Sequence, residues 1–396
     1  MDGSESLADE IFLDRPSYES PIPAAPVKKF LGWHRPRKQF VRTRQWQGEI
    51  AALLRDHPKT HGSTLSYMGL PGADLLDLRH FHTTICTPNG LSLKFLGFNT
   101  GAKPGSKNYD EMTISVDEVR RLEMVDEQSQ IIPDNFALLG SVKSFAFSVA
   151  RKMGPFDIVN LDLCDGFGKG APGAASSSYY DAICQLMALQ SFHDRPWILF
   201  LTTRTDRPTV HPDVLERMST LYKNNLQDHE NFRAASIENF NVDSGNLDQA
   251  LQTAPGHLSV FLTGLAKWFI SVALGGRPQI GVHLRSAMGY KIVKDSTEVD
   301  MVSLAFRCVP SEGAFPDPTG LARNAAIALD EVSLALKAIG KVATMKDVDD
   351  LLANNDSLKN ELVDSMSSLL ELARYNSASY REWVDKDETD DEEATT

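Results

Sequence analysis

A strand-like run that ends in a glycine turn and leads directly into a helix-like segment constrains the fold more than any other part of the sequence. The apolar run begins near Leu65, the turn is Gly69-Leu70-Pro71-Gly72, and a helix is predicted from Ala73. In open α/β sheets, such a turn lets bare backbone approach a ligand at the carboxyl end of a strand. Glycine suits that place because it has no Cβ and accepts positive φ. The sequence therefore predicts an α/β sheet with a ligand-binding edge.

Strand-like and helix-like segments alternate over the first half of the chain. Near-continuous apolar strands in such an alternation are typical of a mostly parallel sheet with helices on both faces. Two later strand-like segments, 279–284 and 301–309, are expected to complete the sheet as an antiparallel pair. The strands are predicted at 65–70, 91–98, 130–132, 156–163 and 196–202, and the helices between them at 73–86, 116–124, 145–152 and 179–192.

Composition divides the chain into five regions. The two ends carry much of the net charge of −13, so acidic, disordered tails are expected there. Beyond Pro316-Asp317-Pro318 the pattern becomes helical. The predicted regions are an acidic, Pro-rich leader (1–27), a basic-aromatic arm with a helix (28–58), an α/β domain (59–315), a helical extension (316–384) and an acidic tail (385–396).

Other sequence features favour a cytoplasmic protein without a membrane span or a metal. The acidic N-terminus lacks the apolar core of a secretory signal. The apolar run 258–273 is interrupted by Gly264 and Lys267, so it is not expected to cross a membrane. The four cysteines are scattered without a CxxC pair, which predicts reduced thiols and no structural zinc. They are Cys86, Cys164, Cys184 and Cys308.

The segment from Lys28 to Trp46 is strongly basic and contains no acid. Aromatic residues are interleaved with its cations, and a nucleic acid can be bound by such a combination of phosphate contacts and base stacking. The alternative is that the aromatics dock the arm on the main domain, while the cations stay in water or pair with the acidic tails. The cations are Lys28, Lys29, Arg35, Arg37, Lys38, Arg42 and Arg44, and the aromatics are Phe30, Trp33, Phe40 and Trp46.

Taken together, the β/α units, the glycine turn, a late helical insertion and the closing antiparallel pair resemble the class I S-adenosylmethionine-dependent methyltransferases. The resemblance covers about residues 60–310 and rests on the order of the elements. It implies a Rossmann-like, mostly parallel seven-stranded sheet whose last strand is inserted antiparallel. It also implies that S-adenosylmethionine lies across the carboxyl ends of the first four strands.

The resemblance assigns roles to single positions. The turn from Gly69 to Gly72 would pass beneath the methionine part of the cofactor, and Asn99 stands where an acid usually binds the ribose hydroxyls. An amide can also bond hydroxyls. Asp134, with Asn135, matches the carboxylate that contacts the adenine amino group. The candidate catalytic residues are Asp162 and Asp165, which match the polar cluster after the fourth strand. Asp162 could instead cap the loop that follows it, and Pro133-Asp134-Asn135 is also an ordinary turn sequence.

Departures from the family pattern keep two functions open. Tyr67, also expected at the cofactor, and Pro71 stand where an acid and a glycine are usual, and no Asn/Asp-Pro-Pro-Tyr/Phe motif follows the fourth strand. Its absence argues against methylation of a base amino group. The first expected function is methyl transfer from S-adenosylmethionine, with nucleic acid preferred as the substrate because of the basic arm. The second is a methyltransferase-like module without catalysis that binds a nucleotide or, through its C-terminal helices, a partner protein.

Overall fold

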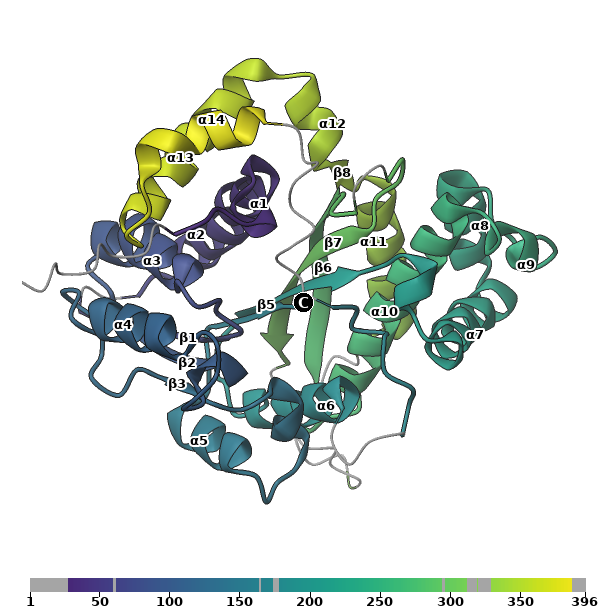
Figure 1. Cartoon of the computed structure of the whole chain (residues 1–396). Helices are drawn as coiled ribbons and strands as arrows, with labels where there is room; N and C mark the ends of the chain where they lie inside the picture. Colours follow the sequence, from purple (N-terminus) through teal and green to yellow (C-terminus); the bar gives the residue numbers. More distant parts are fainter. Residues whose placement is uncertain are drawn as a thin grey trace, which may run out of the picture.

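The computed structural model describes residues 28–59, 62–163, 165–173, 178–293, 296–311, 319 and 329–386. The predicted leader (1–27), Cys164, the proline boundary at 316–318 and most of the acidic tail lie outside these residues. Within them, one sheet of eight strands has the order β3-β2-β1-β4-β5-β7-β6-β8 (Figure 1). The strands are β1 (Thr64–Gly69), β2 (Ser92–Phe98), β3 (Gln130–Ile132), β4 (Ile158–Asp162), β5 (Trp197–Arg204), β6 (Ile280–Tyr290), β7 (Met301–Pro310) and β8 (Lys346–Asp347).

The pairing confirms a mostly parallel α/β sheet with an inserted antiparallel strand. Strands β1 to β5 are parallel to their neighbours among themselves, and β7 is antiparallel to both β5 and β6. The expectation of seven strands was wrong, because the two-residue strand β8 pairs in parallel with β6 at Met288 and Gly289. Strand β6 is also longer than predicted and continues through a bulge between Leu284 and Ser286.

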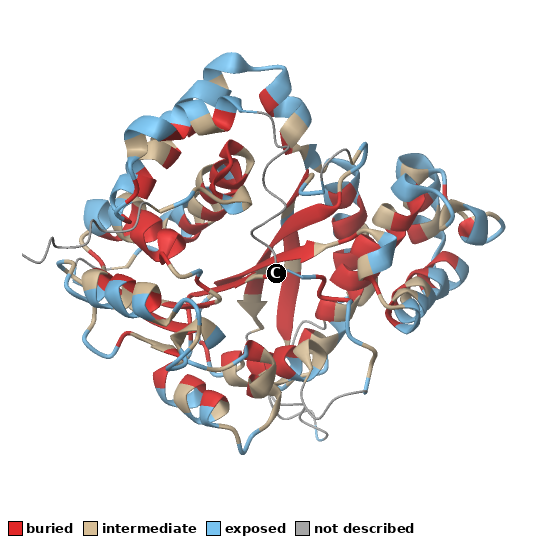
Figure 2. Ribbon diagram, in the orientation of Figure 1, coloured by how far each residue is buried: buried red, intermediate tan, exposed pale blue. Residues whose placement is uncertain are grey.

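The strands are apolar on both faces because helices cover the sheet from both sides (Figure 2). On one face, residues such as Met68 and Val159 pack in a core with α5, α6 and α10. On the other face, Tyr67 and Ile158 pack with α2 and α3. These helices are α2 (Gln47–Asp56), α3 (Leu76–Phe81), α5 (Phe145–Met153), α6 (Tyr179–Gln190) and α10 (Ala254–Leu274).

Helix α10 is the central helix of the insertion before β6. By length and composition it could cross a membrane, but 67% of its most apolar window is buried inside the protein, as in a core helix. Lys267 on this helix is buried and pairs with Glu331 at 2.5 Å. The neighbouring helices are α7 (Pro212–Asp228), α8 (Glu230–Phe240), α9 (Leu247–Ala250) and α11 (Glu331–Ala343).

The basic segment is part of the folded body. Helix α1 (Pro36–Phe40) continues through a π-helical stretch (Val41–Trp46) into α2. Trp46 is fully buried, and its ring lies 6.0 Å from that of Phe200 on β5. The aromatics therefore dock this segment on the sheet, as the alternative interpretation expected.

The C-terminal helices pack on this segment and on α3, as the yellow and purple ribbons of Figure 1 show. Buried residues of α13, among them Leu362, Met366 and Leu370, face the chain's own cores. These side chains of α13 therefore form a packing surface within the chain. These helices are α12 (Val348–Ala353), α13 (Asp356–Glu371) and α14 (Tyr380–Asp385), and α4 (Tyr109–Arg120) lies near the chain end that follows α13.

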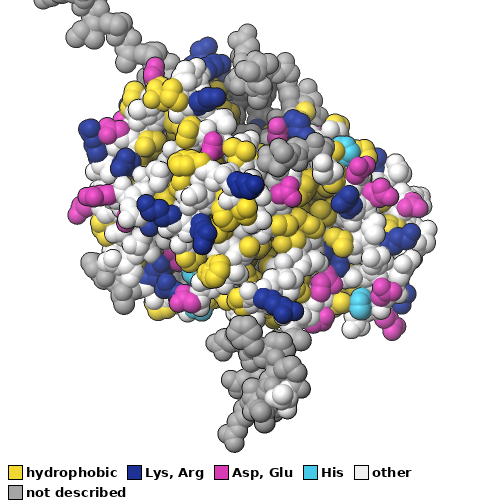
Figure 3. Space-filling view, turned by 90° about the horizontal axis from the view of Figure 1, so that it is seen from below, with side chains coloured by type: hydrophobic (Ala, Val, Ile, Leu, Met, Phe, Trp, Pro, Cys, Tyr) yellow, Lys and Arg dark blue, Asp and Glu magenta, His cyan; other side chains and the backbone are white. Residues whose placement is uncertain are grey.

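The face seen from below carries hydrophobic side chains in a band among scattered charges (Figure 3). In Figure 1, helices α5 and α6 lie on this side of the sheet. Val142 and Phe145, at the start of α5, are among the exposed large hydrophobic residues of the described chain. Single exposed hydrophobic residues are normal on protein surfaces.

Candidate functional site

The carboxyl edge of the sheet contains a topological switch point between β1 and β4. From β1 the chain moves outward to β2 and β3 on one side, and then returns to build β4 and β5 on the other. Gly69, at the end of β1, is level with Gly97 of β2 and Asn160 of β4. Ligands of open α/β sheets bind in the crevice at such a point. Most predicted site residues follow these strands, so the topology brings them to one edge.

Asn99, directly after β2, joins two loops of this edge. Its Nδ2 donates to the carbonyl oxygen of Pro71 at 2.7 Å, and its Oδ1 accepts from the backbone N–H of Gly101 at 2.7 Å. The amide therefore fixes the turn after β1 against the loop after β2. One further N–H and one lone pair stay available for a ligand.

The outer part of the edge, beyond Asn99, is open. No heavy atom lies within 4 Å of the position that a Cβ on Gly72 would occupy. Asp134, after β3, is half-buried. Asn135 is exposed and accepts from the backbone N–H of Ala137 at 2.8 Å, so it caps the 3-10 helix Phe136–Gly140. Gly72, Asn99 and Asp134 are thus solvent-accessible residues in the loops at this edge of the sheet.

The inner part of the edge is filled by the protein's own side chains. A Cβ on Gly69 would lie 2.6 Å from Cζ of Tyr67 and 2.8 Å from its Cε1, and the hydroxyl oxygen would be nearer still. A Cβ on Gly97 would lie 2.8 Å from Cγ of Pro71. The bare backbone that was expected to lie beneath a ligand therefore accommodates Tyr67 and Pro71 instead. For Gly69 this corrects the expected role.

Two polar side chains are buried at the switch point. The hydroxyl of Tyr67 lies beside the side-chain amide of Asn160, and both groups are fully buried without a hydrogen bond of good geometry. Burial raises the pKa of Tyr67 well above its ordinary value, so the hydroxyl stays protonated. Leaving a buried polar group unpaired costs about 1–3 kcal/mol. The fold tolerates that cost at a place where ligands of this type of sheet bind.

Asp162, the first candidate catalytic residue, ends β4 and forms an ion pair with Lys38 of α1. Nζ of Lys38 lies 2.5 Å from Oδ1 of Asp162, and their side chains are 7% and 20% exposed. The ammonium also lies 4.8 Å from the centre of the Trp46 ring. Burial lowers the pKa of Lys38, but the charge of Asp162 and other nearby groups outweighs burial, so the net shift is upward. Asp162 therefore reaches the edge, and its charge is balanced by a cation from the N-terminal segment.

Asp165, the second candidate catalytic residue, is on the surface. Its side chain is 66% exposed, and it pairs at 3.0 Å with Lys169, which is also exposed. Exposed ion pairs of this kind contribute little to stability. The carboxylate of Asp165 therefore pairs with a neighbouring surface lysine, and the structure gives its predicted catalytic role no support.

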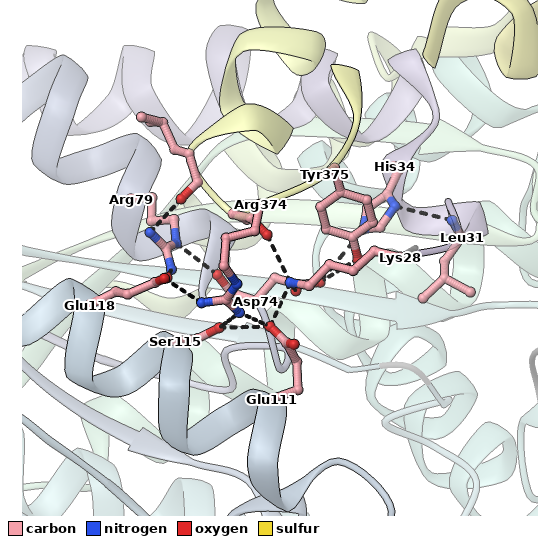
Figure 4. A network of polar contacts seen from close by, with 12 residues as sticks. Lys28, Leu31, His34, Asp74, Arg79, Glu111, Ser115, Glu118, Arg374 and Tyr375 are labelled. Atoms are coloured by element: carbon pink, nitrogen blue, oxygen red, sulfur yellow. Dashed lines mark hydrogen bonds and ion pairs between the residues drawn. The ribbon is translucent and has the colours of Figure 1, made fainter. Parts of the chain in front are cut away.

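Most cations of the basic segment point into the protein. Nζ of Lys28 lies 2.7 Å from Oδ1 of Asp74 and 2.5 Å from Oε1 of Glu111 (Figure 4). Nε of Arg42 lies 2.6 Å from Oδ1 of Asp77 in a buried pair. Acids of the folded body bind Lys28, Lys38 and Arg42, so these pairs do not favour the predicted nucleic-acid contact, which stays a prediction.

Most of the remaining cations of the segment are also bound by other groups of the protein. Arg35 donates to the carbonyl oxygen of Val384, and Arg37 lies 3.5 Å from Asp349. Arg44 is partly exposed and pairs with Glu361. Lys29 is exposed. A nucleic-acid contact through this segment would therefore rest mainly on Lys29 and Arg44.

A polar network that the sequence did not reveal joins the two ends of the described chain to the loop after β1. The hydroxyl of Tyr375 donates to Oδ2 of Asp74 at 2.8 Å, and Arg79 pairs with Glu118 of α4 at 2.6 Å. Arg374 bridges Glu111 and Glu118. Figure 4 shows these side chains converging from segments far apart in the sequence. Only spatial proximity relates them, so no local pattern could have predicted the network.

Two cavities lie away from the predicted site. One of about 430 Å³ is lined by residues of α1, α12, α13 and α14, including Arg37 and Lys359. The other, of about 440 Å³, is at the amino ends of β1 and β4, and its lining includes Lys59, Asp157 and His193. Asp157 and Lys59 form a buried ion pair at 2.8 Å. The second cavity is on the edge of the sheet opposite to the switch-point crevice.

The strand order defines a Rossmann-like α/β protein with the arrangement that the resemblance to class I methyltransferases implied. The chain belongs to the PP_RS20740-like family, whose model matches residues 27–385.

Solved structures with some likeness include a candidate class I S-adenosylmethionine-dependent methyltransferase from Listeria monocytogenes. It has a TM-score of 0.34 and 11% identity, with 81% of each chain covered. Another is a chain from the complex between the Haloferax volcanii Trm112 methyltransferase activator and a candidate methyltransferase. It has a TM-score of 0.31 and 11% identity, with 72% of this chain and 100% of that chain covered. No curated protein matches the sequence.

Proposed function

We propose that this protein binds the adenosine part of an S-adenosylmethionine-type ligand at the carboxyl edge of β1 to β3. The observation that carries the proposal is the set of accessible residues at the outer part of this edge, Gly72, Asn99 and Asp134. A carboxylate such as Asp134 can accept from the amino group of adenine, and the amide of Asn99 can bond ribose hydroxyls. Bare backbone at Gly72 leaves room for the ligand.

The fit to a whole S-adenosylmethionine molecule is limited to its nucleoside half. Asp134, Asn99 and Gly72 suit that half. At the other half, Tyr67 occupies the space over Gly69, and Pro71 occupies the space over Gly97. The residues that would hold the cofactor are therefore those at the outer part of the edge. When bound, the cofactor would supply the methyl group that is transferred.

Methyl transfer is the first activity proposed for this site. The reaction depends mainly on positioning of the acceptor beside the sulfonium and on removal of a proton where the acceptor carries one. Asp162 ends β4 on the same face of the sheet as Tyr67, two residues after Asn160, which favours a role beside the acceptor. In that role Asp162 would orient the acceptor through its partly exposed carboxylate.

Ligand binding without catalysis is the second candidate, and the Lys38–Asp162 ion pair favours it. A carboxylate already paired with a buried ammonium is a weak proton acceptor, because protonating it would leave the ammonium uncompensated. A nucleic acid as the acceptor stays a prediction that would depend on Lys29 and Arg44. A partner protein at the C-terminal helices would have to use residues other than the buried stripe of α13.

Isothermal titration calorimetry with adenosine, 5′-methylthioadenosine and S-adenosylmethionine tests the proposed site. We expect the wild-type protein to bind at least one of these ligands, and Gly72→Arg to abolish that binding. Gly48→Arg is a matched control, because Gly48 is also exposed with no atom within 4 Å of its Cβ position, but it lies on α2. Absence of heat for all three ligands at millimolar concentration would reject the proposal.

Transfer of labelled methyl groups then separates the two activities. If the protein is an active methyltransferase, label from S-adenosylmethionine should reach an acceptor in a cell extract, and Asp162→Ala should stop the transfer while nucleoside binding persists. If it is a binding module, no label is transferred by either protein, although both bind the nucleoside.

A further inference from the structure

We infer that Tyr67 closes the methionine part of the site, so that the carboxyl edge selects adenosine-type nucleosides without an amino-acid tail over S-adenosylmethionine. The inference rests on the proposed function for the location of the ligand. It adds a residue that determines specificity and a chemical class of ligand: adenosine or a 5′-thioether of adenosine.

The ring of Tyr67 fills the space over Gly69 that a methionine tail would need. The ring of Tyr67 runs along β1 and covers Gly69, with Cζ and Cε1 at 2.6 and 2.8 Å from the Cβ position of that glycine. In the fold type that the chain resembles, the turn after the first strand passes beneath the methionine part. An atom of a ligand placed against the backbone of Gly69 would overlap the tyrosine ring. The space over Gly72, further along the same turn, is free.

Neighbouring aromatic rings hold the ring of Tyr67 in place. Tyr67 is 1% exposed, and its ring lies 5.9 Å from that of Phe81 on α3. Phe81 in turn lies 6.4 Å from Trp46, which packs on Phe200. Because close-packed interiors leave few voids, turning the Tyr67 ring out of this cluster would open a cavity. The ring is therefore a fixed wall of the site.

The charged groups near Tyr67 do not suit the amino-acid tail of a ligand. An amino-acid tail brings an ammonium and a carboxylate, and both would need partners in a buried place. Buried cations on this side, such as Lys38 and Arg42, are already paired with acids, here Asp162 and Asp77. The polar groups without a hydrogen bond of good geometry there, the hydroxyl of Tyr67 and the carboxamide of Asn160, are neutral. Such a wall suits an uncharged 5′ group better than a zwitterionic tail.

Calorimetry on the wild-type chain decides the inference without any variant. We expect 5′-methylthioadenosine to bind at least about tenfold more tightly than either S-adenosylmethionine or S-adenosylhomocysteine, a factor that corresponds to about 1.4 kcal/mol. The homocysteine ligand carries the tail without the sulfonium charge, so weak binding of both tailed ligands identifies the tail as the cause. Equal or tighter binding of the tailed ligands would overturn the inference and leave the proposed function intact. No binding of any ligand would overturn both.

Two variants assign the selectivity to the ring. Tyr67→Ala should raise the affinity for S-adenosylhomocysteine about tenfold and change that for 5′-methylthioadenosine by less than about threefold. Tyr67→Phe is the matched control, since it keeps the ring and should keep the selectivity of the wild type. Thermal unfolding establishes that each variant is folded. If Tyr67→Ala is unstable, the ratio measured on the wild type still decides.

Discussion

The ammonium of Lys38 and the carboxylate of Asp162 form an ion pair that links the helix preceding β1 to the carboxyl end of β4, 124 residues further along the chain. The two ends of the pair differ in their surroundings. Lys38 is almost completely buried, whereas the Asp162 side chain retains contact with solvent. The loss of either partner therefore has unequal consequences.

Asp162→Asn is expected to destabilise the protein more than Lys38→Met. The first change leaves a buried ammonium without its counter-charge, which costs about 3 kcal/mol, whereas the second leaves a carboxylate that water can reach and costs about 1 kcal/mol. Urea unfolding of the two variants measures the difference. Asp165→Asn serves as the control, because its exposed pair with Lys169 should contribute less than about 0.5 kcal/mol. Equal losses for all three variants would contradict the asymmetry.

Tyr67→Phe is expected to leave the free energy of unfolding unchanged or to raise it by up to about 1 kcal/mol. Its hydroxyl is buried without a hydrogen bond of good geometry. Removing the hydroxyl therefore removes a desolvation cost that no such bond offsets. Tyr222→Phe provides the comparison, because the buried hydroxyl of Tyr222 bonds Oγ of Ser236 at 2.5 Å and its loss should cost about 1 kcal/mol. Chemical denaturation of both variants tests the opposite signs. A clear loss of stability in Tyr67→Phe would indicate a water or ligand partner for that hydroxyl.

Stability should fall as the pH drops below about 6.5, because histidines with a lowered pKa, among them His34 and His80, are buried in the neutral form. Burial lowers the pKa of His34 and of His80 to about 3. Between about pH 6.5 and pH 3 the unfolded chain binds protons that the folded chain does not, so the free energy of unfolding decreases with acidification. Each histidine adds up to about 1.4 kcal/mol per pH unit.

Urea titrations at several pH values between about 7 and 5 measure this slope. His34→Asn should reduce it by about one proton, since the asparagine side chain can still accept from the N–H of Leu31 as Nδ1 of His34 does. An unchanged slope in the variant would show that His34 binds the same number of protons in the folded and unfolded states over this pH range.

Binding of the chain to DNA or RNA should be weak and should depend little on salt. Lys29 and Arg44 are the cations of the basic segment that remain for phosphates, so the slope of log K against log salt should not exceed about −2. Fluorescence anisotropy with a labelled duplex over a range of ionic strength measures this slope. The Lys29→Ala, Arg44→Ala double variant should abolish the dependence. A steep slope that survives in the double variant would locate nucleic-acid binding elsewhere on the protein.

The sheet could be predicted because its signal is local. Apolar runs such as the one that contains Ile158–Asp162 are bounded by turn residues and alternate with helical periodicity. The helix Gln47–Asp56 lies within the region 28–58, in which the sequence predicts a helix. Strand β6 is longer than predicted, because Ser286 to Gly289 are weak strand formers that gain pairing partners in β7 and β8.

The inner site could be predicted only in part. The residues after β1, β2, β3 and β4 meet at one edge because parallel strands bring their carboxyl ends together, and this follows from the sequence pattern. Which side chains fill the inner part of that edge could not be predicted from the sequence pattern. Lys38 and Arg42 lie in a run that resembles a solvated basic surface, and their acidic partners Asp162 and Asp77 are distant in the sequence. The fold of Tyr67 over Gly69 likewise depends on packing against Phe81.

The contacts between the two ends of the described chain have a consequence for biosynthesis. Lys28 donates to the carbonyl oxygen of Ala373, and the hydroxyl of Tyr380 donates to that of His34. Phe30 packs between the rings of Tyr375 and Trp383. During translation the first helices are made long before these partners emerge from the ribosome. The nascent chain must therefore hold the ring of Phe30 without these aromatic partners until the C-terminal helices have emerged, and premature termination near residue 355 would leave it exposed and promote aggregation.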